Sequence, residues 1–350
     1  MCAPRSGMPS ETACAGPPAC AAPPLRGRYG NAFSITGTMK VRALNFLVCP
    51  SCQSTLKLTT DEQDGSEVLT GTLRCLECDA TYPVVRGIPR FVDADSYASS
   101  FGRQWTWFRK VQLDSMNGTC ESERALLATT GWQESDYAGA LVLDAGVGAG
   151  RFAECVARKD AEVFGVDISS AIDAAYLNIG RLPNVHLAQA DIFALPFRER
   201  TFDLAYSIGV LHHTPDPRAA FDRLAANVKV GGGLAVYLYD RYGFAHRFPD
   251  LARKITTRLP LRVMGVISAL SIPLYYVYRL PVIGKLLNLL FPISMLPDWR
   301  WRWLDTFDWY TPRYQWKFLY PEVFRWFREN RFKEVEIFDG PIRMRGVKAA

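Results

Sequence analysis

Apolar runs of strand length alternate with segments of helical periodicity through the middle of the chain. Leu141–Phe152 begins with an apolar run that predicts a buried strand, and the residues after Gly150 have helical spacing. Four more strand-like runs follow in order: Glu162–Asp167, Val185–Ala190, Phe202–Ile208 and Leu234–Tyr239. Strands that alternate with helices in this way predict an α/β fold built on a parallel sheet.

Three glycines follow the first predicted strand at alternate positions, Gly146, Gly148 and Gly150. Glycine lets a strand-to-helix turn fold sharply and lets a ligand approach the main chain closely. A dinucleotide-binding turn has the spacing G-x-G-x-x-G, whereas here the third glycine comes one residue earlier. The turn therefore predicts a small polar ligand of another kind, and a glycine-rich turn without a ligand is the alternative.

The string D-A-G-V-G-A-G resembles the first motif of class I S-adenosylmethionine-dependent methyltransferases of the type 11 or coenzyme Q kind. The resemblance covers about Leu141–Tyr239 and resumes after Tyr320. It implies an α/β fold with a Rossmann-like seven-stranded class I methyltransferase sheet and S-adenosylmethionine as the cofactor. The expected cofactor-binding residues are Asp144, Gly146, Gly148, Gly150, Asp167, Ile168, Asp191, Ile192 and Ser207.

Two of these expectations assign particular contacts. A carboxylate at the end of a second strand accepts hydrogen bonds from ribose hydroxyls in other nucleotide-binding sheets, and Asp167 stands at that position. In the methyltransferase family, the position of Asp191 and Ile192 contacts the adenine.

Two histidines follow the fourth predicted strand, where this fold places its substrate-facing loop. The stretch L-H-H-T-P-D-P resembles L-E-H-x-P-D-P of coenzyme Q-type O-methyltransferases, with His213 at the family's His and His212 at its Glu. A histidine can act as general base for a hydroxyl near neutral pH, so His213 and His212 are the candidate catalytic residues. The alternative is that they cap the next helix or bind the loop backbone.

Four of the nine cysteines form two C-x2-C pairs, Cys49 with Cys52 and Cys75 with Cys78. This spacing is typical of a structural zinc site with four thiolate ligands, and two disulfides or four free thiols are the alternative. The flanking residues resemble the Trm112-like zinc-ribbon family, whose free-standing members bind and stabilise methyltransferases. A ribbon within the same chain is expected to brace the enzyme or to dock its substrate. The remaining cysteines show no pairing pattern, which predicts a reducing, cytoplasmic location.

These patterns divide the chain into five parts. The predicted parts are a disordered tail (1–38), the zinc ribbon (39–94), an aromatic linker or lid (95–135), the methyltransferase domain (136–239 and 316–350) and a basic, apolar helical insertion (240–315). In the linker, Phe101, Trp105 and Phe108 share one helical face, which either packs on the sheet or covers the cofactor with help from Gln104.

The net charge of +6 is concentrated in the insertion, where ten Lys and Arg residues stand against two acids between Arg241 and Trp303. Prolines interrupt its apolar runs, and W-R-W-R-W alternates aromatic rings with cations. The insertion is expected to form a helical cap over the acceptor pocket, to lie in a membrane interface, or both if the acceptor is lipid-linked. Candidate acceptor contacts are Asp308, Tyr310, Arg313 and Tyr314.

The sequence thus predicts a methyltransferase that acts on an oxygen of a small-molecule or lipid-linked acceptor. Peripheral contact with the inner membrane surface is expected, and no protein partner can be named. A ribosomal RNA or tRNA methyltransferase with ribbon-mediated recognition is one alternative. Nucleic acid is the less favoured partner, because the cations are interleaved with apolar runs. A non-catalytic scaffold that keeps the fold is the second alternative.

Overall fold

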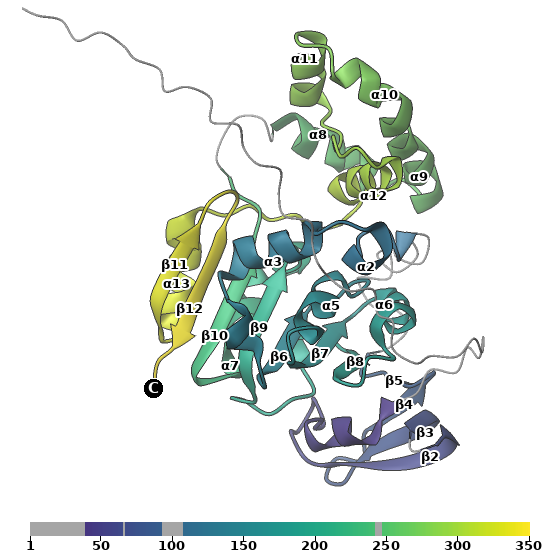
Figure 1. Cartoon of the computed structure of the whole chain (residues 1–350), viewed down its shortest axis with the longest axis vertical. Coiled ribbons are helices and arrows are strands. Elements are labelled where there is room, and N and C mark those ends of the chain that lie inside the picture. Colours follow the sequence, from purple (N-terminus) through teal and green to yellow (C-terminus); the bar gives the residue numbers. More distant parts are fainter. Residues whose placement is uncertain (1–38, 66, 93–107, 242–246) are drawn as a thin grey trace, which may run out of the picture.

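The computed structural model describes residues 39–65, 67–92, 108–241 and 247–350. The predictions for residues 1–38 and for Phe101, Gln104 and Trp105 lie outside the described residues. Figure 1 shows a twisted central sheet, with a small β-rich ribbon at the bottom of the view and a group of helices at the top.

Seven strands of the described chain form the central sheet in the order β11-β12-β10-β9-β6-β7-β8. The strands are β6 (Leu141–Ala145), β7 (Glu162–Asp167), β8 (Val185–Gln189), β9 (Phe202–Ile208), β10 (Val228–Tyr237), β11 (Phe332–Phe338) and β12 (Arg343–Lys348). Neighbouring strands from β6 to β10 pair in parallel, whereas β12 is antiparallel to both of its neighbours. The predicted seven-stranded α/β sheet is confirmed.

The chain order of the sheet reverses at β6, because β7 and β8 lie on one side of it and β9 and β10 on the other. The loops that leave β6 and β9 therefore run in opposite directions and leave a crevice at the carboxyl ends of the strands. Ligands of open α/β sheets bind at this kind of switch point.

The fifth predicted strand is longer than expected at its amino end. β10 already pairs with β9 at Val228, and its register shifts before Gly233. Gly231, with φ +82°, lies within this irregular stretch, and a Cβ on Gly232 would lie 2.5 Å from the carbonyl oxygen of Asp203. The glycines thus form a bulge inside the strand, ahead of the start that the sequence predicts at Leu234.

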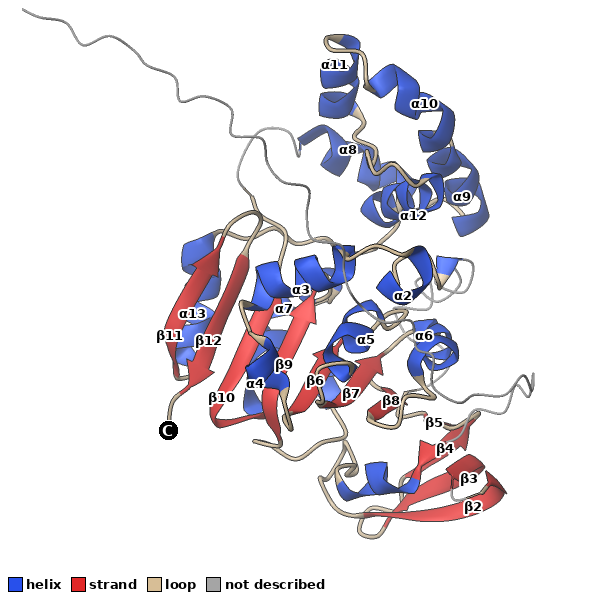
Figure 2. Ribbon diagram, viewed as in Figure 1, coloured by secondary structure: helices blue, strands red, loops and turns tan. Residues whose placement is uncertain are grey.

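Helices cover both faces of the sheet (Figure 2). They are α2 (Asp114–Asn117), α3 (Glu121–Thr130), α4 (Glu134–Tyr137), α5 (Arg151–Ala157), α6 (Ala171–Ile179), α7 (Pro217–Ala226) and α13 (Tyr320–Glu329). Because side chains alternate along a strand, Leu143 packs in the core beneath α7 and α13 while Val142 packs in the core beneath α3, α5 and α6. Each face of the sheet therefore has its own apolar core.

The ribbon is a five-stranded antiparallel sheet that shares the first of these cores. Its strands are β1 (Met39–Lys40), β2 (Leu56–Asp64), β3 (Glu67–Cys75), β4 (Thr81–Val85) and β5 (Ile88–Pro89). Leu47 of the ribbon forms a backbone bridge with Phe197, and Arg90 forms one with Gln189 at the end of β8. The ribbon is therefore joined to the edge of the central sheet by backbone pairing as well as by apolar contact.

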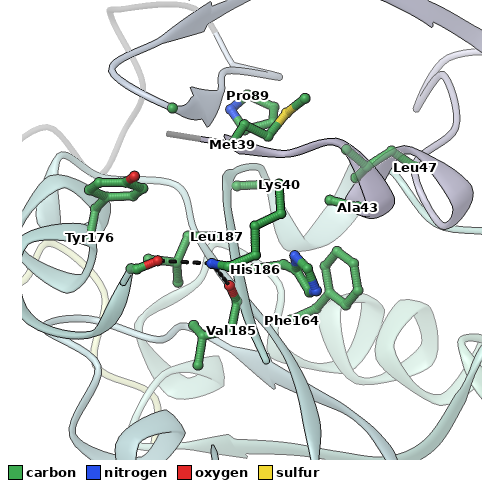
Figure 3. A pocket seen from close by; sticks show the side chains of 13 residues that line it. Met39, Lys40, Ala43, Leu47, Pro89, Phe164, Tyr176, Val185, His186 and Leu187 are labelled. Atoms are coloured by element: carbon green, nitrogen blue, oxygen red, sulfur yellow. Dashed lines mark hydrogen bonds between the residues drawn. The ribbon is translucent and has the colours of Figure 1, made fainter. Parts of the chain in front are cut away.

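A partly buried cation contributes to this junction. Lys40 donates from Nζ to the carbonyl oxygens of Gly180 and Val185, at 2.9 and 2.8 Å (Figure 3). Burial lowers the pKa of Lys40 to about 8. Arg90 adds an ion pair with Asp173, at 2.7 Å. Both cations come from the ribbon, so polar contacts add to the apolar junction between the ribbon and the sheet.

The insertion forms a separate helical layer at the carboxyl ends of the strands. Its helices are α8 (Arg247–Thr256), α9 (Leu261–Ala269), α10 (Ser271–Tyr278), α11 (Ile283–Leu290) and α12 (Trp299–Tyr310). We call α8–α12 the crown, which stands clear of the sheet in Figure 1.

Phe197 tests how firmly the ribbon and the sheet are joined. Its ring is 2% exposed and packs edge-on against Phe164 and Phe202, at centroid distances of 5.3 and 4.9 Å. We expect Phe197→Ala to lower the free energy of unfolding by about 3–5 kcal/mol, because it leaves a cavity in the shared core. Denaturant unfolding followed by circular dichroism measures this change.

The matched control is Phe324→Ala, because Phe324 is 39% exposed on α13. Its effect should stay within about 0.5 kcal/mol. A ribbon that unfolds in a separate transition, unaffected by Phe197→Ala, would contradict the shared core.

Candidate functional site

The turn between β6 and α5 is held open by its glycines. Gly146, Gly148 and Gly150 all have positive φ, at +93°, +54° and +93°. A Cβ on Gly146 would lie 2.3 Å from the Val210 side chain, and one on Gly150 would lie 2.7 Å from Ile179. Only glycine satisfies both the backbone angle and the space at these two positions.

Hydrogen bonds fix this turn against the end of the neighbouring strand β7. The backbone N–H groups of Gly146 and Val147 both donate to the carbonyl oxygen of Val166, at 2.8 and 2.9 Å. Gly148 donates its N–H to Oδ2 of Asp167, at 3.0 Å, and Ser169 donates its N–H and its hydroxyl to Oδ1. The carboxylate is thus held in one orientation at the strand end.

A cavity of about 470 Å³ opens above this turn, within the usual size range of small-ligand pockets. Its wall includes four of the predicted cofactor residues, from the turn and the end of β7, and two aromatic rings from the end of β10 and the residues that follow it. The lining residues used below are Gly146, Gly148, Asp167, Ile168, His213, Tyr237, Tyr239, Asp305, Asp308, Trp309 and Arg343. The cavity therefore lies at the switch point of the sheet.

Five predicted cofactor residues lie outside the lining of this cavity, among them Gly150 at the start of α5. Asp144 is buried beneath the turn and accepts a hydrogen bond from the Tyr206 hydroxyl, at 2.9 Å; burial raises its pKa to about 7. Ser207 is fully buried and donates its hydroxyl to the carbonyl oxygen of Ala145, at 2.8 Å. These two side chains support the strands from below, so a direct cofactor contact would require them to move.

Asp191 and Ile192 belong to a short helical turn after β8. The Asp191 carboxylate accepts the backbone N–H of Phe193, at 3.0 Å, and burial raises its pKa. Ile192 is 7% exposed and joins the apolar core. The adenine contact expected for this pair stays a prediction.

Helix α12 covers the cavity from the crown side. Asp305, Asp308 and Trp309 all line it, although only Asp308 had been predicted from the sequence. Burial raises the pKa of Asp305 to about 6, while the positive charge of Arg151 opposes this shift. Near neutral pH the Asp305 carboxylate is therefore mostly ionised inside the cavity.

The predicted general base lies in the same cavity. His213 donates a hydrogen bond from Nδ1 to the carbonyl oxygen of Tyr314, at 2.8 Å, because a carbonyl can only accept. This bond assigns the proton to Nδ1 and makes Nε2 the basic nitrogen. Burial, opposed by the hydrogen bond to the Tyr314 carbonyl and aided by the charge of Arg253, lowers the pKa of His213 to about 4.

His212 differs from its neighbour, because its ring is fully buried and does not line the cavity. The ring stacks on Tyr239 at a centroid distance of 3.9 Å, and neither nitrogen has a hydrogen-bond partner among the described residues. Burial lowers its pKa well below the usual value. The side chain thus packs as a neutral ring behind the cavity wall, and this position does not suit the catalytic role that we had considered for it.

Other candidate acceptor contacts are used structurally. The Tyr310 hydroxyl donates to the carbonyl oxygen of Pro292, at 2.9 Å, and Arg313 is exposed. The W-R-W-R-W stretch forms the start of α12, where Trp301 and Arg302 are buried while Trp299 is 46% exposed. Because the stretch is helical, its residues point to different sides and do not form one interfacial face.

The four cysteines of the ribbon converge on one point. Their Sγ atoms all lie within 4.8 Å of one another, with separations of 3.6 Å for Cys49–Cys78, 3.4 Å for Cys52–Cys75 and 3.5 Å for Cys52–Cys78. A tetrahedral zinc site with Zn–S bonds of about 2.3 Å has sulfur–sulfur separations of about 3.8 Å. The arrangement therefore fits one zinc ion with four thiolate ligands.

Electrostatics at this cluster also favour a cation. The backbone N–H groups of Cys78 and Glu77 lower the pKa of Cys75. The N–H of Ala80 lowers the pKa of Cys78, but the sulfurs of Cys52, Cys75 and Cys49 outweigh it and raise that pKa to about 12. Four thiolates can share this space only if a metal ion balances their charge.

Comparison with known protein families agrees with both parts of the chain. Residues 143–236 match the family described as "Methyltransferase domain", and residues 40–87 match the family described as "Trm112p-like protein". The chain thus carries a class I S-adenosylmethionine-dependent methyltransferase domain preceded by a Trm112-like region.

Individual relatives match over part of their length. A ubiquinone biosynthesis O-methyltransferase of Albidiferax ferrireducens is 35% identical over 27% of this chain and 39% of its own length. The O-methyltransferase cnsE of Penicillium expansum is 29% identical over 48% of this chain and 63% of its own. The chain therefore spans less than two thirds of the curated relatives that it matches.

One solved structure with a partial likeness is a complex of two proteins. The complex between the Haloferax volcanii Trm112 methyltransferase activator and a methyltransferase aligns with a TM-score of 0.42 and 12% identity, over 71% of this chain and 98% of that chain.

Metal removal provides a test of the cysteine cluster. We expect one zinc ion for each chain by elemental analysis, and none in Cys75→Ser. A strong chelator should lower the melting temperature of the whole protein by several degrees, because about 1 kcal/mol corresponds to roughly 2–4 °C in domains of this size. The ribbon shares its core with the sheet, so the loss should reach both.

Cys75→Ser is also the control for the chelator. A fall in the melting temperature of Cys75→Ser on chelation, as large as that of the wild type, would show that the chelator acts elsewhere. An unmodified protein that contains no zinc would refute the metal site.

The second test concerns the Asp167 carboxylate, which joins the turn after β6 to the end of β7. Asp167→Asn removes the charge of a carboxylate that faces the cavity. We expect the affinity for S-adenosylmethionine to fall about 10- to 100-fold, because hydrogen bonds to charged groups contribute about 1.5–3 kcal/mol. Isothermal titration calorimetry measures the affinity.

Asp222→Asn is the matched control, because Asp222 on α7 binds Arg218 outside the cavity. Its affinity for the cofactor should equal that of the wild type. Equal affinity in Asp167→Asn would refute the role that we assign to this carboxylate.

Proposed function

We propose that this chain transfers a methyl group from S-adenosylmethionine to an oxygen of a small-molecule or lipid-linked acceptor. One observation carries the proposal: His213, with its proton fixed on Nδ1, lines the same cavity as the glycine turn and Asp167. A methyl donor and a proton acceptor would thus meet in one enclosed space. The two O-methyltransferase relatives support an oxygen as the target.

The residues at the strand ends suit the cofactor. Asp167 would hold the ribose hydroxyls, and the space above Gly146 and Gly148 would hold the methionine part close to the backbone. Tyr237, Tyr239 and Trp309 contribute aromatic faces to the cavity, and the electron-rich face of a ring attracts a sulfonium cation. When bound, the cofactor supplies an already activated methyl group.

The protein then has two tasks, to orient the acceptor and to remove its proton. Nε2 of His213 would accept the hydroxyl proton as the acceptor oxygen attacks the methyl carbon in line. With a pKa of about 4, His213 is neutral and able to accept a proton throughout the physiological range. So weak a base is best matched to an acidic hydroxyl such as a phenol or an enol.

The acceptor side of the cavity is built by the crown. Asp308 and Trp309 of α12 line the cavity together with the glycine turn, and Arg343 comes from β12. An aromatic wall with a few polar groups suits a flat, partly apolar acceptor. The acceptor class is therefore expected to depend on α12 more than on the sheet.

Methyl-labelled S-adenosylmethionine tests the function directly. The protein should transfer label into a lipid or small-molecule extract, and not into RNA. His213→Ala should lower kcat about 10²- to 10⁴-fold, the usual contribution of a general base, while the cofactor affinity measured by calorimetry stays unchanged.

The matched control is His212→Phe, which keeps a ring on Tyr239 and removes two nitrogens without partners among the described residues. Its kcat should stay near that of the wild type. Unchanged turnover in His213→Ala would refute the role of His213 as general base. Label found in RNA alone would refute a small-molecule or lipid-linked acceptor.

A further inference from the structure

The crown exposes more large apolar side chains than it buries. Seventeen large apolar residues between Leu251 and Trp299 are exposed, and the most exposed are Val266 at 71%, Tyr276 at 72% and Val282 at 80%. The buried apolar cluster that the crown helices share is small and consists of Met264, Phe307 and Tyr310. Since soluble domains rarely expose apolar surface on this scale, the crown has the character of a contact surface.

The charges of the crown indicate which surface it contacts. The chain contains no Asp or Glu from Leu251 to Pro297. The exposed cations in this range are Lys254, Arg258, Arg262, Arg279 and Lys285. A second copy of the chain would bring the same positive charge against this surface, whereas anionic lipid headgroups would neutralise it. Charge complementarity therefore favours an anionic bilayer.

The geometry of α9 and α10 favours a helix pair that lies on the bilayer. Leu261–Tyr278 is long and apolar enough to cross a membrane by composition, and 22% of it is buried in the protein. However, Trp303 of α12 donates from Nε1 to the carbonyl oxygen of Gly265 and to the hydroxyl of Ser268, at 2.9 and 3.0 Å. One side of α9 is thus fixed against α12, so only the other side is available to lipid.

A cation–π contact fixes α10 against α12. The Arg302 guanidinium lies 3.6 Å from the centroid of the Tyr275 ring, and Arg302 also donates to two carbonyl oxygens ahead of α12. The inner side of the α9–α10 pair therefore packs on α12 through Met264, hydrogen bonds and the cation–π contact. The exposed apolar side chains of the pair lie on its outer side, which is left for lipid.

Helix α12 connects this surface with the cavity. Trp303 contacts α9, while Asp305, Asp308 and Trp309 of the same helix line the cavity. An α-helix with its side chains is about 10–12 Å across, so one helix separates the apolar surface from the methyl-transfer site.

We propose that the crown docks peripherally into the surface of a bilayer that contains anionic lipid, with the outer side of α9–α11 in the interface. The exposed apolar side chains enter the headgroup boundary and the cations contact lipid phosphates. An acceptor held in the bilayer then reaches the cavity over α12, and only this last step rests on the proposed function.

Vesicle co-sedimentation of the full chain tests the docking. Vesicles of phosphatidylcholine with phosphatidylglycerol should bind the protein in a salt-sensitive manner, and phosphatidylcholine alone should bind it weakly. A variant with Arg262→Gln, Arg279→Gln and Lys285→Gln should bind the mixed vesicles about 100-fold more weakly, from about 1 kcal/mol for each cation near the surface.

A second variant tests the apolar contribution. Val266→Ser, Tyr276→Ser and Val282→Ser together should reduce vesicle binding by more than about 100-fold, because each removes an apolar side chain that the interface would bury. The matched control replaces three exposed apolar residues elsewhere, with Leu76→Ser, Leu177→Ser and Ile337→Ser, and should bind vesicles as the wild type does.

Calorimetry measures the affinity of each variant for S-adenosylmethionine and so reports whether the cofactor site is still folded. All three variants should bind the cofactor normally, so loss of vesicle binding is separate from loss of function. The docking proposal is overturned if the wild type ignores anionic vesicles, or if the control variant loses binding as much as the crown variants. It is also overturned if the crown substitutions abolish self-association in place of vesicle binding. Cofactor binding that fails in every protein overturns the proposed function instead.

Discussion

The hydrogen bond from the Gly148 N–H to the Asp167 carboxylate sets the geometry on which the site depends. It joins the turn after β6 to the end of β7 at 3.0 Å, so two strand ends act as one rigid edge. The cavity, the crown helix above it and the histidine across it are all arranged relative to this edge. The glycines are required because a Cβ on Gly146 would collide with the Val210 side chain and one on Gly150 with Ile179.

Sequence patterns predicted the sheet well, because buried parallel strands produce compact apolar runs. Strands β7 and β9 have the predicted bounds, and the ribbon cysteines converge as their spacing indicated. The bulge in β10 was missed, since a glycine triplet indicates a turn unless the pairing partner is known. Local pattern determines where a strand lies, while register depends on contacts from distant parts of the chain.

The site was only partly predictable for the same reason. Which of two adjacent histidines reaches the cavity depends on the rotation of one short helical turn, and the structure places His213 on the wall and His212 behind it. Asp305 was missed because nothing in its local sequence marks it as a cavity residue. Its role comes from the packing of α12 over a turn that lies about 150 residues earlier in the chain.

The placement of ribbon and crown at opposite ends of the molecule has a consequence for how the protein is oriented (Figure 1). A molecule seated by its crown would direct the cysteine cluster away from lipid and into bulk water. Metal exchange would then respond to the soluble metal pool, whereas acceptor supply would respond to the composition of the bilayer. One polypeptide would thereby contact bulk water at one end and the bilayer at the other, with the central sheet holding the two ends apart.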